Sequence, residues 1–335
     1  MLNPQNEAGE APGELFQDDA LRWKTAPRES FLAFLAHRAT LGAHLESTSV
    51  RIYLGMFDRL CAWLEEAGRG LMTLDEASLS RFLDSRRLSD GTRHRYLLLF
   101  TALYRHLQAI EAARNNPTLM LMREAGRPDR DPPESLLPIE VRALLSQAHL
   151  ARTWKHRRNE ALILTFLSTG MRVRESMAWQ LPMALEALSR SNAKSVVIPG
   201  AREAREVPVL PVGRAPLVQW VAERGAMAIP GPCVFPAGET GASLAPSTIF
   251  RQARSRLERA GIVRRYEGPT LLRNTYGAIV LALHGLEAAR LAMGHETLET
   301  TLLYAPAAKI WEQAFKSGSI PASTFLGDQE GAPSD

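Results

Sequence analysis

The chain has 335 residues, a length that exceeds one ordinary domain and suits two. Its hydrophobic content of 45% and charged content of 23% are typical of a globular protein with sizeable buried cores, which excludes a disordered or fibrous chain. The two cysteines, Cys61 and Cys233, lie far apart in the sequence, so we expect no disulfide framework and a reducing, cytoplasmic environment.

The charged residues give a first indication of the partner. The net charge is only +4, but 40 residues are basic and just five of these are lysines. Arginine is suited to bidentate contact with phosphate, and a sequence pI of about 9.3 is compatible with nucleic-acid binding. A GC-rich genome would give the same arginine excess, so composition alone leaves both readings open.

The first part of the chain predicts an arm followed by a helical domain. Residues 1–26 are polar, contain glycine and proline, carry no signal-peptide pattern, and are expected to form a flexible arm. Helical periodicity then predicts a bundle of four or five helices in a domain over residues 27–123. A Thr-x-x-Glu capping box is expected to start one helix, from Thr73 to Glu76.

One predicted helix of this bundle, in "LSDGTRHRYLLLFTALYRHLQAI", carries several basic residues. We interpret them as one basic edge, with Arg93, Arg95 and Arg105 as candidate DNA-binding residues.

A linker separates this bundle from the second half of the chain. Residues 124–137 contain three prolines, a glycine and alternating charges, which predicts an interdomain linker. A second domain is expected over residues 138–316 and a tail over residues 317–335. The most apolar stretch, "YGAIVLALHGL", is too short to cross a bilayer, so no membrane contact is expected.

The second domain is expected to be mostly helical with one small hairpin. "RNEALILTFLSTGMRVRESMAWQL" predicts a long apolar helix that breaks at Gly170. In "AKSVVIPGAREAREVPVL", residues 196–198 and 207–210 flank a Pro-Gly turn and predict a pair of antiparallel strands. The fold class expected for the whole chain is therefore mainly α, with a small antiparallel β-hairpin or sheet.

Four residues of this second domain are candidates for chemistry. Arg172 follows the glycine break, and Glu175 lies one helical turn later, where it can orient the guanidinium group. Arg273 interrupts another apolar stretch, and His295 and Tyr304 follow it. Taken singly, each has a structural explanation: a surface ion pair, a snorkelling arginine, a core histidine or a packed tyrosine.

Taken together, these residues resemble the tyrosine recombinase family, which includes phage integrases and Xer-type resolvases. The family's first box, T-G-hydrophobic-R-x-x-E, is matched by Thr169, Gly170, Met171, Arg172 and Glu175. Its second box supplies an arginine before an apolar helix, matched by Arg273. Its third box is matched by Gly294, His295, Thr300, Thr301 and Tyr304. The resemblance covers roughly residues 30–310 and includes a core-binding domain in the helical first half.

The resemblance implies a function as a site-specific DNA recombinase that acts by transesterification. Tyr304 would attack a DNA phosphodiester and form a 3′-phosphotyrosyl bond, and Arg172 and Arg273 would hold the non-bridging oxygens. His295 would either hydrogen-bond the same phosphate or take the tyrosine proton. No metal or other cofactor is implied. The implied partners are double-stranded DNA and further copies of the chain, with a tetramer on paired sites.

The sequence departs from the family pattern at two places. Thr270 stands where the second box carries histidine or lysine, and the hairpin turn lacks the family's lysine. Arg202 lies near that turn and would stabilise charge, although arginine hardly releases a proton. Lys194 lies at the start of the incoming strand. Thr270 can donate a hydrogen bond but cannot carry a proton charge. Three possibilities therefore stay open: Arg202 compensates electrostatically, Lys194 is the general acid, or catalysis is intrinsically slow.

Two other functions remain open at this level. The first is a DNA-binding, architectural member of the same family that has lost turnover and assists a partner recombinase. The second is a helical scaffold unrelated to DNA. Retention of Tyr304 favours the enzyme, which would be expected on a mobile element and associated with the nucleoid. The sequence does not distinguish integration, excision and resolution.

Overall fold

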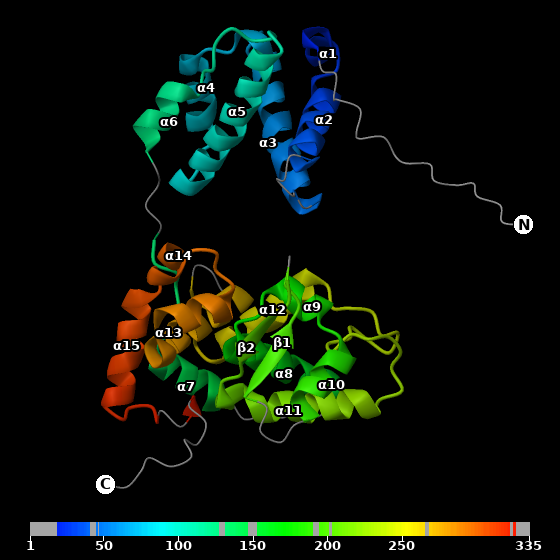
Figure 1. Cartoon of the computed structure of the whole chain (residues 1–335), viewed down its shortest axis with the longest axis vertical. Coiled ribbons are helices and arrows are strands. Elements are labelled where there is room, and N and C mark those ends of the chain that lie inside the picture. Colours follow the sequence, from blue (N-terminus) through cyan, green and yellow to red (C-terminus); the bar gives the residue numbers. More distant parts are fainter. Residues whose placement is uncertain are drawn as a thin grey trace, which may run out of the picture. The chain divides into compact units, whose positions relative to one another are not determined.

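The computed structural model describes residues 19–40, 45, 47–126, 131–146, 153–189, 194–200, 203–264, 268–321 and 324–325. The chain divides into two compact units, unit 1 (residues 1–129) and unit 2 (residues 130–335) (Figure 1). Each unit has its own hydrophobic core. None of the helices in these described parts is both long and apolar enough to cross a membrane.

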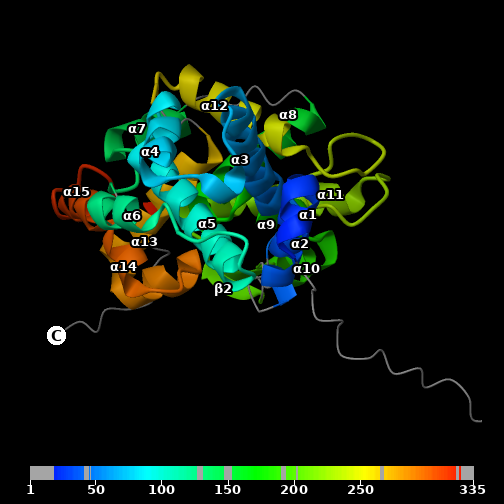
Figure 2. The ribbon, with the colours of Figure 1, turned by 90° about the horizontal axis from the view of Figure 1, so that it is seen from above.

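The regular elements of unit 1 are all helices in the residues that the structure describes. Its helices are α1 (Ala20–Thr25), α2 (Pro27–Thr40), α3 (Ser47–Glu66), the 3₁₀ helix η1 (Leu71–Thr73), α4 (Glu76–Ser85), α5 (Asp90–Ala109) and α6 (Leu119–Ala125). Helix α2 runs beside α3 (Figures 1 and 2). Side chains three and four residues apart on α3 and α5 share one face and are fully buried in the core, among them Phe57, Leu60, Phe100 and Tyr104.

Helix α1 lies in a segment that the sequence places in the flexible arm. Its N-cap Asp19 accepts a hydrogen bond of 2.7 Å from the backbone amide of Arg22. Trp23 is 1% exposed and lies edge-on to Phe57, with 6.4 Å between ring centroids. Burial of a tryptophan side chain outweighs the weak helical pattern of this short segment, so residues 20–25 belong to the core of unit 1.

The start of α4 also differs from the expected capping box. Thr73 lies in η1, and the N-cap of α4 is Asp75, whose carboxylate accepts a hydrogen bond of 2.7 Å from the backbone amide of Ser78. A carboxylate is favoured at this position because it also interacts with the positive end of the helix dipole. The predicted cap at Thr73 is therefore wrong by two residues.

Unit 2 is mainly helical. Its elements are α7 (Pro138–Ser146), α8 (Trp154–Thr169), α9 (Val173–Ala178), α10 (Leu181–Ser189), β1 (Ser195–Ile198), β2 (Arg205–Pro208), α11 (Pro211–Ala226), α12 (Pro246–Arg259), α13 (Pro269–Met293), α14 (Leu298–Leu302) and α15 (Ala305–Lys316). In the described part of the chain, the only sheet is the antiparallel pair β1–β2. The expected fold class, mainly α with a small antiparallel hairpin, is confirmed.

The hairpin has a definite register, in which Ser195 pairs with Pro208 and Ile198 with Arg205. Strand β2 therefore begins and ends two residues earlier than the 207–210 predicted from the sequence. Val209 and Leu210 are buried beyond the end of β2, and α11 begins directly after them at Pro211. Strand β1 packs against α10, and β2 packs against α13.

Helices α8 and α13 lie side by side at the centre of unit 2. Helix α8 ends at Gly170, which adopts a left-handed conformation with φ of 62°. A Cβ atom at Gly170 would lie 2.3 Å from Cδ1 of Tyr276 on α13, so the close approach of the two helices also requires glycine here. The predicted break at Gly170 is confirmed as this C-cap.

Both ends of unit 2 are anchored by segments that the sequence assigns to the linker and the tail. The backbone amide of Leu136, which is 1% exposed, donates a hydrogen bond of 2.8 Å to Thr275 Oγ1 on α13. Phe325 is 2% exposed and packs edge-on against Trp311 of α15, with 5.5 Å between ring centroids. The core of unit 2 therefore extends beyond residues 138–316 on both sides.

Candidate active site

Arg172, Arg273, His295 and Tyr304 come from four different places in unit 2. Arg172 is the N-cap of α9, immediately after the α8 break, and Arg273 lies in the second turn of α13. His295 follows the left-handed C-cap Gly294 at the end of α13, and Tyr304 is the N-cap of α15. Each of these four side chains thus lies near the start or the end of a helix: α9 for Arg172, α13 for Arg273 and His295, and α15 for Tyr304.

Arg172 and Glu175 form a reciprocal contact at the start of α9. Arg172 Nη1 lies 2.8 Å from Glu175 Oε1, and the Arg172 backbone amide donates to Glu175 Oε2 at 2.7 Å. The Arg172 side chain is 46% exposed, whereas that of Glu175 is 6% exposed. The contact places Glu175 where it can orient the Arg172 guanidinium, while the N-cap position leaves Arg172 itself at the surface.

A third arginine, Arg205, completes this cluster and was not found from the sequence. Its Nη1 and Nη2 lie 2.6 Å and 2.9 Å from the two carboxylate oxygens of Glu175, and its side chain is 15% exposed. Burial alone would raise the pKa of Glu175, but the hydrogen bonds from Arg205 and Arg172 lower it more, so the net pKa shift is downward. Glu175 is therefore a buried carboxylate shared between two arginines.

Alternation along β2 is the signal that could have found Arg205. Val207 is buried and Glu206 is exposed, so Arg205 points to the same inner face as Val207. The two-residue error in the predicted strand placed Arg205 outside it and concealed this period.

Arg273 is held by the carboxyl ends of two helices. It is 8% exposed, and its guanidinium donates Nη1–H to the carbonyl of Gly170 and Nη2–H to the carbonyl of Met293. Helix α13 is broken at Gly285, whose φ of 81° is not helical, and this kink lets its last part return to Arg273. The two carbonyls thus end α8 and the last part of α13, where the helix dipoles favour a cation. Burial, together with the nearby charge of Arg172, lowers the pKa of Arg273 to about 10, so it stays charged at neutral pH.

The carboxyl end of α13 also contacts Arg172. Arg172 Nη2 lies 3.4 Å from the carbonyl oxygen of Met293 and 3.3 Å from that of Gly294. The same end of α13 thus draws Arg172 and Arg273 together, which concentrates positive charge at one place.

His295 lies against this positive charge. Its backbone amide donates to the Arg290 carbonyl at 3.0 Å, and its Nδ1 lies 2.9 Å from Thr301 Oγ1. Burial, followed by the charges of Arg273, Arg172 and Arg205, lowers the pKa of His295 to about 4. His295 is therefore neutral at physiological pH.

Tyr304 is almost fully enclosed, at 7% exposure. Its hydroxyl donates to Asn274 Oδ1 at 3.1 Å, and its ring stacks on His295 with 5.7 Å between centroids and 29° between planes. Burial raises the pKa of Tyr304, and Arg273 and Arg172 offset only part of this effect. The phenol is consequently protonated at neutral pH and must lose this proton if it attacks a substrate.

Asn274 is a further site residue that sequence reasoning missed. It directly follows Arg273 on α13, and its amide Nδ2 donates to the Glu134 carbonyl at 2.9 Å. This bond fixes the amide so that Oδ1 faces Tyr304. No local pattern marks an asparagine inside an apolar helix as such a contact.

No protein-family model matches the sequence, and no curated protein matches it significantly. Among solved structures, the site-specific recombinase XerH bound to palindromic difH substrate matches with a TM-score of 0.67 and 20% identity, covering 82% of this chain and 80% of that one. A lambda integrase dimer bound to a COC′ core site matches with a TM-score of 0.61 and 13% identity, covering 82% and 93%.

The integrase of the Tn1549 transposon, in complex with a circular intermediate DNA, matches similarly, with a TM-score of 0.60, 15% identity and coverage of 82% and 93%. The chain has the tyrosine recombinase fold. The resemblance inferred from the sequence is thereby confirmed at the level of the fold.

Of the three residues considered in place of the missing histidine and lysine, the structure describes Thr270 and Lys194. Thr270 is exposed in the first turn of α13, one turn before Arg273. Arg202 lies outside the described residues. Lys194 precedes β1, and its carbonyl accepts from the Val209 amide at 2.8 Å, at the end of the hairpin away from the turn.

The register separates Lys194 from the cluster. Arg205 pairs with Ile198, four residues after Lys194 along the strand, which corresponds to about 13 Å of extended chain. The hairpin thus brings Arg205 to Glu175 and leaves the Lys194 backbone at its far end.

The candidate DNA-binding arginines of unit 1 do not form one edge of α5. A helix turns by about 100° per residue, so Arg93 and Arg105 point about 120° apart and Arg93 and Arg95 about 160° apart. Arg93 forms an ion pair of 2.6 Å with Asp84, whereas Arg95 is exposed. Arg93 is thus set apart from Arg95 and Arg105, and DNA binding by these three residues stays a prediction.

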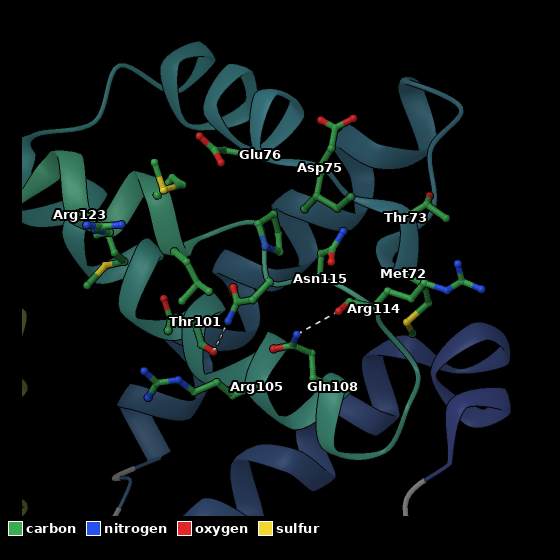
Figure 3. A pocket seen from close by; sticks show the side chains of 16 residues that line it. Met72, Thr73, Asp75, Glu76, Thr101, Arg105, Gln108, Arg114, Asn115 and Arg123 are labelled. Atoms are coloured by element: carbon green, nitrogen blue, oxygen red, sulfur yellow. Dashed lines mark hydrogen bonds between the residues drawn. The ribbon is translucent and has the colours of Figure 1, made fainter.

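Arg105 lines a pocket of about 1050 Å³ in unit 1, together with Arg114 and Arg123 (Figure 3). The loop after α5 and the helix α6 supply these two additional arginines, which sequence reasoning did not single out. Among the described residues, no three His, Cys, Asp or Glu side chains gather where they could hold a metal ion.

Proposed function

We propose that this protein is a site-specific DNA recombinase that uses Tyr304 as its nucleophile. The observation that carries the proposal is the convergence of Arg172, Arg273, His295 and Tyr304 on the carboxyl end of α13, within the tyrosine recombinase fold. The solved structures with this fold include recombinases and integrases bound to DNA sites, which supports DNA as the substrate.

The proposed reaction exchanges one phosphoester for another. Tyr304 Oη forms a bond to phosphorus at a DNA phosphodiester, and the bond from phosphorus to the 5′ oxygen breaks. The tyrosine loses its proton and the leaving 5′ oxygen gains one, so charge is balanced. Because the phosphotyrosyl bond retains the energy of the original ester, the reverse attack by another 5′-hydroxyl rejoins the strands without a nucleotide cofactor.

The arginines supply the electrostatic part of this mechanism. In the transition state, negative charge accumulates on the non-bridging oxygens, and guanidinium groups offer two parallel N–H donors to such oxygens. Arg273 is already fixed by two carbonyls. Arg172 is exposed, and apart from its ion pair with Glu175 its contacts are the longer ones of 3.3–3.4 Å to the end of α13. Arg172, Arg205 and Arg273 set three positive charges against the single carboxylate of Glu175, so net positive charge remains for phosphate.

The DNA-bound assembly extends the same proposal. A chain that cleaves one strand needs partners on paired sites to exchange strands, so we expect a homotetramer on DNA. Both units would contact the duplex, with arginine–phosphate contacts dominating affinity and making it salt-dependent. A role on a mobile element and association with the nucleoid belong to this proposal as well.

A second candidate function is supported by the departures at Thr270 and Lys194. Thr270 stands where the family has histidine or lysine, and Lys194 lies at the end of the hairpin away from its turn. Among the described residues, protonation of the leaving 5′ oxygen therefore has no evident donor. A DNA-binding member that assists a partner recombinase would need the arginine-rich surface but not turnover.

Covalent adduct formation separates the two functions. Duplexes bound by the purified chain would be selected from a randomised pool, and the selected sequence prepared with a nick beside the cleavage position to trap the phosphotyrosyl product. We expect a covalent protein–DNA adduct with the wild type and none with Tyr304→Phe, at nearly unchanged DNA binding. Binding without adduct in the wild type would support the architectural function, and equal adduct in the Phe variant would refute Tyr304 as the nucleophile.

A further inference from the structure

The buried hydroxyl of Thr301 forms a hydrogen bond with one ring nitrogen of His295. Thr301 is 1% exposed, and its Oγ1 lies 2.9 Å from His295 Nδ1. Within the described residues, this contact is the hydrogen bond that the Thr301 hydroxyl makes. Because the hydroxyl is shielded from water, the fate of its proton decides which ring nitrogen of His295 carries hydrogen.

Two arrangements fit the 2.9 Å contact. Either the hydroxyl donates to an unprotonated Nδ1, or a protonated Nδ1 donates to the hydroxyl oxygen. The second arrangement leaves a buried hydroxyl proton without an acceptor, which lowers its population by roughly tenfold or more. The first arrangement satisfies both groups and places the ring hydrogen on Nε2.

We infer that Thr301 fixes His295 as the Nε2–H tautomer, so that His295 offers a hydrogen-bond donor to the substrate phosphate rather than a base for Tyr304. The part that concerns the substrate rests on the proposed function. Thr301 is thus a positioning residue that acts through His295.

The position of Tyr304 is consistent with this role. The two rings are stacked, with 29° between their planes, whereas the lone pair and the N–H of an imidazole lie in the plane of its ring. The Tyr304 hydroxyl donates to Asn274 Oδ1 at 3.1 Å rather than to a ring nitrogen of His295.

The charges around His295 keep its ring neutral at physiological pH, so the ring carries a single N–H, on either Nδ1 or Nε2. Arg172 from α9, Arg205 from β2 and Arg273 from α13 face the ring, and together with burial they keep its pKa at about 4. Their carboxylate partner Glu175 has its own pKa lowered and stays ionised, and Arg290 donates to the His295 carbonyl. A neutral imidazole beside these cations supplies a hydrogen to an anion without adding another buried charge.

Tautomer assignment by NMR tests the inference without DNA. The full chain would be labelled with ¹⁵N-histidine, and His295 would be assigned among the eight histidines by the signal lost in His295→Gln. At pH 7 we expect the pattern of an Nε2–H tautomer. In Thr301→Val the Nδ1 resonance should move and the Nε2–H population should fall, whereas Thr301→Ser should match the wild type. An Nδ1–H pattern in the wild type, or an unchanged spectrum in Thr301→Val, would overturn the inference.

Adduct formation on the nicked duplex tests the donor role. Glutamine keeps an N–H donor but cannot act as a base, so His295→Gln should stay within about tenfold of the wild type, while His295→Ala should lose roughly 10²- to 10³-fold, as for a lost oxyanion donor. Thr301→Val should lose activity that Thr301→Ser retains. Equal losses in the Gln and Ala variants would overturn the donor role even if NMR shows Nε2–H. If the wild type forms no adduct, the proposed function fails while the tautomer result still stands.

Discussion

Removal of Arg205 is predicted to destabilise unit 2 because it leaves a buried carboxylate with one partner too few. Arg205→Met keeps the approximate length of the side chain and removes both of its hydrogen bonds to Glu175, at 2.6 Å and 2.9 Å. Glu175, at 6% side-chain exposure, would then rely on Arg172, which is 46% exposed, and on one backbone amide.

The size of the effect follows from this partial loss. Breaking a buried ion pair by removing one partner costs about 3–5 kcal/mol of stability. Two hydrogen bonds from Arg172 to the carboxylate remain, so we expect the lower end, about 3 kcal/mol. The double variant Arg205→Met/Glu175→Gln removes the stranded charge and should recover a large part of the loss.

Acid should reduce the difference between the wild type and Arg205→Met. The folded-state pKa of Glu175 lies below its ordinary value of 4.5, so its ion pairs contribute stability that is present above pH 4.5 and is lost as pH falls through the folded-state pKa. In Arg205→Met the carboxylate can be protonated more readily, which relieves the stranded charge. The destabilisation is therefore expected to be largest at neutral pH and smaller below about pH 4.5.

Native-state hydrogen exchange measured on peptides is the suitable assay, because it reports the two units separately. Peptides from α8 and α13 should lose protection in Arg205→Met, while peptides from α3 and α5 of unit 1 serve as the internal control. A loss below about 1 kcal/mol in unit 2 at neutral pH would show that water or a rearranged Arg172 replaces Arg205, and the account of the buried carboxylate would be wrong.

Three further predictions concern the site and its support. Arg273→Ala should lower adduct formation by roughly 10²- to 10³-fold in the nicked-duplex assay, as for a lost oxyanion donor, with a much smaller loss of DNA binding. Gly170→Ala should destabilise unit 2 by about 1–3 kcal/mol in denaturant unfolding, since its Cβ would overlap Tyr276 and alanine is strained at a φ of 62°. Thr270→His should raise adduct formation by roughly tenfold or more by supplying an acid, whereas Lys194→Ala should change it little; the reverse order would refute the hairpin register.

The parts of this structure that depend on local patterns could be predicted from the sequence. The break at Gly170, the Arg172–Glu175 contact and the existence of the hairpin all follow from spacings of a few residues. Local patterns failed where two solutions compete within a few residues. Thr73 and Asp75 both provide a side-chain oxygen that could cap α4, and the structure uses Asp75.

Contacts between distant segments could not be predicted in this way. Arg205 reaches Glu175 across 30 residues, and Leu136 reaches Thr275 across 139. Each depends on how elements pack in three dimensions, which a single sequence does not encode as a period. Trp23 shows the same limit, since its burial against Phe57 is decided by the packing of α1 rather than by the polar composition around it.

In the proposed reaction, Arg172 and Arg273 would hold the phosphate in different ways. Arg273 is buried and is fixed by carbonyls at the ends of two helices before any phosphate is bound, so it needs no reorganisation when the transition state forms. Arg172 is exposed, and its contacts to the same helix end are long, so it can exchange them for phosphate oxygens as DNA enters. Arg205 supports this exchange because it contacts both carboxylate oxygens of Glu175, so the carboxylate keeps a partner when phosphate draws Arg172 away.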